Sequence, residues 1–177
     1  MTIDRPQASE FNEYYGRYIG KVPATGPAAA LQDQIAQFER LRGLSEQDAG
    51  YRYAEGKWRV KEVVGHIADT ERLFSYRLLH IVRGDPAPLP GMDEKVWSAV
   101  APHATRRISE IADEMMAVRR ATLALVGSID ADALARTGVA STFPISARAL
   151  CWILPGHTQH HLDVLRERYV VTAASLS

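Results

Sequence analysis

Three features are scarce or absent in this sequence of 177 residues. It contains one cysteine, Cys151, so no internal disulfide can form, which excludes a secreted domain that depends on cross-links. The longest wholly apolar run, residues 149–154, is far shorter than the roughly 20 residues needed to cross a bilayer. Lys plus Arg and Asp plus Glu number 21 each, so no overall field attracts the protein to nucleic acid or to an anionic membrane.

The N-terminal residues also lack the apolar segment of a signal peptide, because residues 1–8 include Asp4, Arg5 and Gln7. Hydrophobic residues make up 46% and charged residues 24% of the chain, the usage of a globular rather than a disordered protein. We therefore expect a cytoplasmic protein with no membrane and no nucleic-acid partner. The length predicts a single domain over residues 1–177.

Apolar residues repeat with a helical period in four segments, at about 27–41, 60–81, 108–125 and 146–169. Because each helix has one apolar face that must be buried, the pattern predicts an all-α fold, a four-helix bundle. The connections, at about 43–59, 83–106 and 128–145, are longer than usual, and few segments resemble strands. An aromatic segment around residues 11–19 is expected to pack as a short extra N-terminal helix, with a loose arm as the alternative.

Two histidines, His157 and His161, lie in the middle of the apolar face of the last predicted helix, in line with Leu150, Leu154 and Val164. Residues four apart are about 40° apart around a helix, so both rings can converge on one point inside the bundle. Each buried polar group without a partner costs roughly 1–3 kcal/mol, and a divalent metal would satisfy both rings. The alternative is a histidine pair that lies on the surface by chance.

A catalytic zinc-type centre takes three protein ligands and leaves one position open. His66 is the best third candidate, because it lies among apolar residues about 60° from the apolar face of the second helix; the alternative is a hydrogen-bonded core histidine. His160 points toward the rim of the bundle, although a His157/His160 pair is a possible substitute. His80 and His103 are expected at ordinary surface positions.

Glu71 lies near the centre of the apolar face of the second helix. A buried carboxylate must be paired. The expected partner is an arginine such as Arg77 or Arg119, and the alternative role is to orient a metal-bound histidine. Asp69 and Glu62 lie away from this face and are expected to contact solvent.

Three further residues have mainly structural interpretations. Pro155 predicts a kink just before His157, interpreted as a packing adjustment. Cys151 is expected to be a small core residue and Trp58 an anchor at the end of the bundle. Gly-rich phosphate loops, Gly-x-Ser-x-Gly elbows and paired-cysteine metal motifs do not occur, so no catalytic residue is assigned.

Two motifs resemble the DinB/YfiT-like superfamily: residues 56–72 (GKWRVKEVVGHIADTER) and residues 156–162 (GHTQHHL). Together they are fairly specific, and the likeness covers about residues 26–169, which we take as the core of the domain. The resemblance implies a four-helix bundle in which His66, His157 and His161 hold a divalent metal. It also implies a homodimer, and some relatives are thiol-dependent transferases or isomerases.

Zinc or nickel with an open position could lower the pKa of a bound thiol or of a bound water. The first hypothesis is therefore a metal-dependent S-transferase of the detoxification type, which uses a low-molecular-weight thiol and a small-molecule substrate. The second is a metal-dependent hydrolase. The third is a stress-associated bundle that binds a metal or ligand without catalysis. These interpretations leave the general base and the roles of Glu71 and His160 open.

Overall fold

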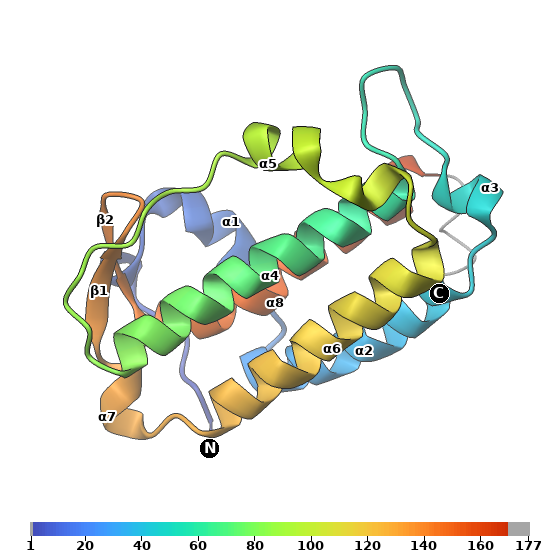
Figure 1. The fold of residues 1–177 in the computed structure, drawn as a ribbon. Coiled ribbons are helices and arrows are strands. Elements are labelled where there is room, and N and C mark those ends of the chain that lie inside the picture. Colours follow the sequence, from blue (N-terminus) through green and yellow to red (C-terminus); the bar gives the residue numbers. More distant parts are fainter. Residues whose placement is uncertain (1, 170–177) are drawn as a thin grey trace.

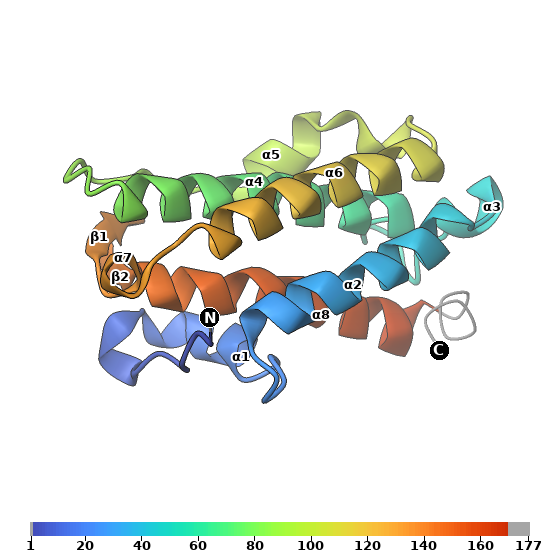
Figure 2. The same cartoon turned by 90° about the horizontal axis from the view of Figure 1, so that it is seen from below.

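The computed structural model describes residues 2–169, so part of the predicted domain 1–177 lies outside the described residues. Four long helices dominate the structure: α2 (Pro27–Arg42), α4 (Val60–Val82), α6 (Ile108–Gly127) and α8 (Ala147–Arg168) (Figures 1 and 2). Helix α2 packs on α6, α6 on α4, α4 on α8, and α8 on α2, which closes the ring. The predicted all-α four-helix bundle is confirmed.

The helices start where the sequence supplies their first hydrogen bonds. Pro27 is the first residue of α2 and follows Gly26, whose φ of 90° suits glycine. At the start of α4, the backbone N–H of Arg59 donates to Glu62 Oε2 at 2.7 Å. At the start of α8, Ser146 Oγ accepts from the backbone N–H of Ala149 at 2.9 Å. The predicted helix starts near residues 27, 60 and 146 agree with these bounds.

The N-terminal segment forms three short turns, η1 (Ala8–Glu10), η2 (Glu13–Tyr15) and α1 (Gly16–Ile19). Helix α1 packs against α8, and Figure 2 shows this segment lying along that helix. A Cβ atom on Gly156 would lie 2.2 Å from the backbone oxygen of Tyr18, so only glycine permits this approach. The aromatic segment therefore packs on the bundle, as expected, and it is not a loose arm.

The long connections hold small elements: α3 (Glu46–Ala49), α5 (Glu94–Val100), η3 (Pro102–Ala104) and α7 (Ala131–Leu134). A two-stranded antiparallel sheet, β1 (Thr137–Ala140) with β2 (Phe143–Ser146), was not predicted. Its strands have four residues each, and they include Gly138 and Pro144, which both weaken a strand pattern in the sequence. The hairpin packs on α4: a Cβ on Gly138 would lie 2.8 Å from Ile81 Cγ1.

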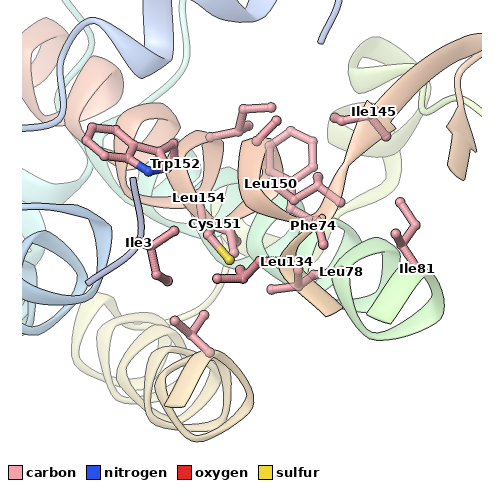
Figure 3. Close-up of a cluster of buried hydrophobic side chains, with 14 of the residues drawn as sticks. Ile3, Phe74, Leu78, Ile81, Leu134, Ile145, Leu150, Cys151, Trp152 and Leu154 are labelled. Carbon is pink, nitrogen blue, oxygen red and sulfur yellow. The ribbon is translucent and has the colours of Figure 1, made fainter. Parts of the chain in front are cut away.

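The apolar core has two parts. One lies around α8 near its start, with Phe74, Leu78 and Ile81 of α4, Cys151, and Ile3 of the N-terminal segment (Figure 3). The other gathers residues nearer the opposite ends of the helices: Phe38, Leu41, Ile67, Met115, Leu162 and Leu165. Cys151 is buried in the first part, as predicted.

A layer of buried polar residues separates the two apolar clusters. Each long helix contributes at its middle: Gln34 from α2; His66, Thr70 and Glu71 from α4; Arg119 and Thr122 from α6; His157 and Thr158 from α8. Polar groups are buried at this level only where they have partners or a function. The search for a site therefore starts in this layer. Among the described residues, no helix is long and apolar enough to span a membrane.

Candidate metal centre

Helices α4 and α8 bring three histidines together. His157 and His161 are one turn apart on α8, with their Nε2 atoms 3.1 Å from each other. His66 comes from α4, and its ring centre lies 5.2 Å from that of His157 and 4.7 Å from that of His161. One nitrogen from each ring lies within 4.8 Å of the others, so the three rings are close enough to share one ion.

Burial keeps these three imidazoles neutral. It lowers the pKa of His66 to about 4. It also lowers the pKa of His157 and of His161 well below the ordinary value, and the neighbouring histidines lower both further. A neutral imidazole offers a lone pair to a metal, whereas a protonated one does not. The donor set therefore fits a divalent ion such as zinc or nickel at pH 7.

Aromatic rings surround the three histidines. Trp58 lies against His66 with ring centres 4.8 Å apart, and Tyr18 and Phe74 meet His157 edge-on at 5.3 and 5.7 Å. Trp58 was expected as an anchor at the end of the bundle, and its contact with His66 was not predicted. Apolar walls of this kind exclude water and strengthen electrostatic interactions at the site.

His160 lies outside the cluster at the rim, as expected. It is partly buried, and its ring centre lies 5.5 Å from that of Tyr18 and 5.1 Å from that of His161. Burial and the positive charges of Arg17 and Lys21 lower its pKa. The His157/His160 pair is therefore not the pair that meets His66.

The surface position predicted for His103 is wrong. This side chain lies in η3 and is buried against α4, where a Cβ on Gly65 would come within 2.3 Å of its Cγ. Its Nε2 is 2.9 Å from Asp69 Oδ2, and its buried Nδ1 has no partner among the described residues. Gly65 makes room for the ring, but no pattern in the sequence indicates that residue 103 lies against it.

Asp69 and His80 were also expected at the surface, and both are less exposed than expected. Asp69, expected to contact solvent, is 30% exposed at its side chain and is held by His103 and by Arg72 at 3.6 Å. The His80 side chain is only 7% exposed, with Nε2 3.3 Å from Asp85 Oδ2. Both differences arise because residues outside the helix, which periodicity does not place, fold back onto α4.

Glu71 pairs with Arg119, one of the two arginines predicted as its partner. Arg119 Nε donates to Glu71 Oε1 at 2.7 Å and Nη2 donates to Oε2 at 2.6 Å. The remaining donors reach Leu31 O, Gln34 Oε1 and Thr158 Oγ1 at 2.8–3.0 Å. Every partner is inside the bundle, so this cluster joins all four helices next to the histidines. No contact between Glu71 and an imidazole nitrogen is observed among the described residues.

Two hollows adjoin the histidines. A cavity of about 210 Å³ reaches His66 and His157 from the side of α1 and the hairpin. A broader groove of about 600 Å³ runs past His161, Trp58 and Tyr53. Both lie against the imidazoles, so a substrate has room beside an ion held there.

A third space is much smaller. It measures about 20 Å³ and is lined by His66, Asp69, His103 and Glu62, among others. That volume holds about one water molecule. Glu62 caps the start of α4 through Arg59 N, so its carboxylate is used within the chain and is not simply solvated.

Comparisons with known proteins agree with this architecture. YfiT from Bacillus subtilis, described as "a probable metal-dependent hydrolase with an unusual four-helix bundle topology", superposes with a TM-score of 0.69. That match covers 97% of this chain and 93% of the other at 18% identity, so it shows a shared fold. A protein of Oceanobacillus iheyensis named "putative metal-dependent hydrolase" is 31% identical over 61 residues, 34% of this chain. The match spans only 35% of that relative's length.

The sequence profile of the DinB superfamily matches residues 30–165. This range includes all four long helices in whole or in large part, together with the three histidines. The family resemblance noted from the two motifs is confirmed, and the chain belongs to the DinB superfamily.

Proposed function

We propose that the protein is a metal-dependent hydrolase of small molecules, in which His66, His157 and His161 hold a divalent ion, zinc or nickel. The observation that carries the proposal is the convergence of three neutral imidazoles in the polar layer, with ring nitrogens within 4.8 Å of one another. Three ligands leave a coordination position open. The names of the two similar proteins support hydrolysis.

A divalent ion held by these three imidazoles would activate water as a nucleophile, because such an ion lowers the pKa of water to about 7. Hydrolysis also needs a proton acceptor from the chain. His103 lines the water-sized space next to His66, and its Nε2 is 2.9 Å from Asp69 Oδ2. An imidazole oriented by a carboxylate, with its other nitrogen unpaired, is the arrangement of a general base. We assign this role to His103 and the positioning role to Asp69.

The metal assignment is tested by elemental analysis of the purified protein and of single histidine variants. We expect one equivalent of metal in the wild type and none in His161→Ala, with helical content unchanged. His160→Ala, at the rim, is the matched control and should retain the full equivalent. A His161→Ala protein that keeps one equivalent would remove His161 from the site.

The general base is tested by kinetics on metal-loaded protein with a panel of esters, amides and lactones. His103→Gln should lower kcat by about 10²–10⁴-fold with metal content unchanged, because general-base catalysis contributes about that much. His80→Gln, which removes a histidine from the far end of α4, should leave kcat unchanged. Equal kcat for wild type and His103→Gln at full metal content would reject the assignment.

A thiol S-transferase is the second candidate, and the groove of about 600 Å³ beside His161 favours it. That groove has the size of an ordinary small-molecule site and could hold a low-molecular-weight thiol next to the ion. Metal-loaded protein that joins a small thiol to an electrophile, but cleaves no ester or amide, would favour this function over hydrolysis.

We further propose that the protein is a single cytoplasmic domain, as its length and composition indicate, and that it forms a homodimer, as the family resemblance implies. The N-terminal aromatic segment is one candidate dimer surface: Tyr14 is 53% exposed there, whereas Tyr18 and Ile19 are buried against the bundle. Helix α5 is the second candidate and exposes Val96, Trp97 and Val100, with 61%, 43% and 82% of their surfaces accessible. Sedimentation of Val96→Glu against wild type would test α5 as the interface.

A further inference from the structure

The cavity of about 210 Å³ beside the histidines contains a charge that the proposed hydrolysis does not use. Arg77, on the same helix as His66 and three turns further on, lines this cavity. Only 2% of its surface is exposed. His66 and His157 line the same cavity, so a molecule bound there reaches from the arginine toward the metal centre.

Arg77 has no anionic partner among the described residues. Its Nη2 donates to two neutral oxygens, Pro90 O at 2.7 Å and Ser141 Oγ at 3.0 Å. Its Nε is buried without a hydrogen bond in the described part of the chain. A buried guanidinium is costly unless an anion neutralises it, and Glu71, the nearest buried carboxylate on the same helix, is taken by Arg119.

The surroundings of Arg77 favour a planar, partly apolar anion. The aromatic rings of Tyr14, Tyr15, Tyr18 and Phe74 line the cavity. Glu94, at the exposed start of α5, is the acidic residue at its edge. A second cation, Arg17, lies over the Tyr14 ring at 3.7 Å and donates to Tyr18 Oη at 3.0 Å, so it lies beside two of the rings that line the cavity.

The hydroxyl that contacts Arg77 comes from an unusual turn. Ser141 and Thr142 form the two-residue connection of the hairpin, and both have positive φ, 53° and 71°. Turns of this type ordinarily use Asn and Gly, and a β-branched residue with positive φ is strained. The turn thus presents Ser141 Oγ to Nη2 at a conformational cost, in agreement with a binding role for this end of the cavity.

We propose that this cavity is the substrate pocket and that Arg77 binds a carboxylate of the substrate. Nη1 makes no hydrogen bond in the described part of the chain, so it is the donor available for a carboxylate oxygen, whereas Nε is enclosed by the protein. The substrates would then be small carboxylic acids with an apolar or aromatic body, whose scissile bond lies toward His66 and His157. The orientation of the substrate rests on the proposed hydrolase function, but carboxylate binding does not.

The test uses benzoate as the probe and metal-free protein, so that the ion cannot bind the carboxylate itself. Isothermal titration should show that wild type binds benzoate at least tenfold more tightly than benzamide, its neutral analogue. Arg77→Met should weaken benzoate binding at least tenfold and leave benzamide unchanged, with Arg77→Lys between the two. The matched control is Arg83→Met, at the exposed end of the same helix, which should bind benzoate as wild type does.

Equal affinity of wild type and Arg77→Met for benzoate, or no benzoate binding to wild type at tens of millimolar, would overturn the proposal. Tighter binding of inorganic phosphate than of benzoate would also overturn it and would point to phosphate esters. If Arg77→Met does not fold, the proposal is tested by NMR of the wild type with added benzoate. The backbone amide signals of Thr70 and Ser141 should shift. Shifts confined to other residues would reject the pocket.

The failure of this proposal can be distinguished from failure of the hydrolase. Benzoate binding should persist in metal-free His161→Ala, whereas metal content should be unaffected by Arg77→Met. Loss of metal binding with intact benzoate binding would reject only the metal centre. Intact metal binding with benzoate affinity insensitive to residue 77 would reject only the carboxylate pocket.

Discussion

Within residues 2–169, two arginines are buried, and they differ in what surrounds them. Arg119 is fully buried and makes two hydrogen bonds to Glu71, with its remaining donors bonded to neutral oxygens. Arg77 is 2% exposed, and within the described residues it donates hydrogen bonds only to a carbonyl and a hydroxyl, both from Nη2. The first guanidinium is satisfied by the fold, whereas the second lines a cavity.

The difference separates a polar group that serves the structure from one that is available for binding. A buried charge whose donors are all bonded within the chain holds helices together and offers nothing to a ligand. A buried charge that has free donors and lines a cavity is available to bind a ligand of opposite charge. The three clustered histidines also line the two larger hollows, and His103 lines the water-sized space.

The largest effect is expected when the satisfied pair is broken. Glu71→Ala leaves Arg119 buried without an anion, which should lower the free energy of unfolding by about 3–5 kcal/mol. Guanidinium-induced unfolding measures this loss. The double variant Glu71→Leu/Arg119→Met should lose much less than the sum of the two single changes, because it removes both charges. A cost below about 1 kcal/mol for Glu71→Ala would mean that the pair is not a structural element.

The three clustered histidines are buried in their neutral form, so the stability of the protein should depend on pH. The pKa of His66 is about 4 in the folded metal-free protein and about 6.5 in an unfolded chain, so the unfolded state binds more protons between these values. Stability should therefore fall as the pH falls from 6.5 to 4, by about 3 kcal/mol from His66 alone. The depressed pKa values of His157 and His161 act in the same direction.

This dependence is measured by denaturant titration of metal-free protein across that pH range. His66→Phe, which cannot take up the proton, should lose less stability than the wild type over the same interval. A wild-type stability that stays constant or rises between pH 6.5 and 4 would contradict the neutral state assigned to these imidazoles.

A smaller loss of stability is expected from a change next to His103. Like Arg119, this buried side chain is paired with a carboxylate, that of Asp69. Gly65→Ala places a Cβ within 2.3 Å of the His103 ring and should force the ring away from Asp69. Overpacking of this kind costs about 1–3 kcal/mol. Gly127→Ala, where nothing lies within 4 Å of the added atom, is the control and should not destabilise. Thermal unfolding compares the two variants, and equal melting temperatures would show that the ring moves freely.

The smallest effect is expected at the unsatisfied arginine. Arg77→Met removes a buried charge that has no carboxylate partner, so stability should change by less than about 1 kcal/mol. The measurement is the same denaturant titration used for Glu71→Ala. A loss comparable to that of Glu71→Ala would make Arg77 a structural residue and would erase the contrast between the two arginines.

The sequence predicted most features that depend on one helix at a time. The four helices, their starts, and the seam through His157 and His161 follow from apolar spacing along each helix. The pairing of Glu71 was narrowed to two arginines, because a carboxylate on an apolar face requires a cation. That His66 would join the pair on α8 was inferred from its apolar neighbours and from the family resemblance.

Features that depend on two segments far apart in the sequence were missed or wrongly placed. His103 was assigned to the surface because its connection has no period, and its burial depends on the space left by Gly65. The contact of Trp58 with His66 and the hairpin that brings Ser141 to Arg77 were not predicted. In each case a connection folds back onto a helix. The spacing of apolar residues along the chain does not predict which helix a connection will contact.

What the sequence determined by itself is thus the set of helices and the faces that they bury, because periodicity and capping are local properties of the chain. Only the tertiary structure decided which faces meet: the order α2, α6, α4, α8 around the ring, the choice of Arg119 over Arg77 for Glu71, and the cavity that leaves Arg77 unpaired. Those outcomes depend on how all four helices and their connections fill space together, which no single segment encodes.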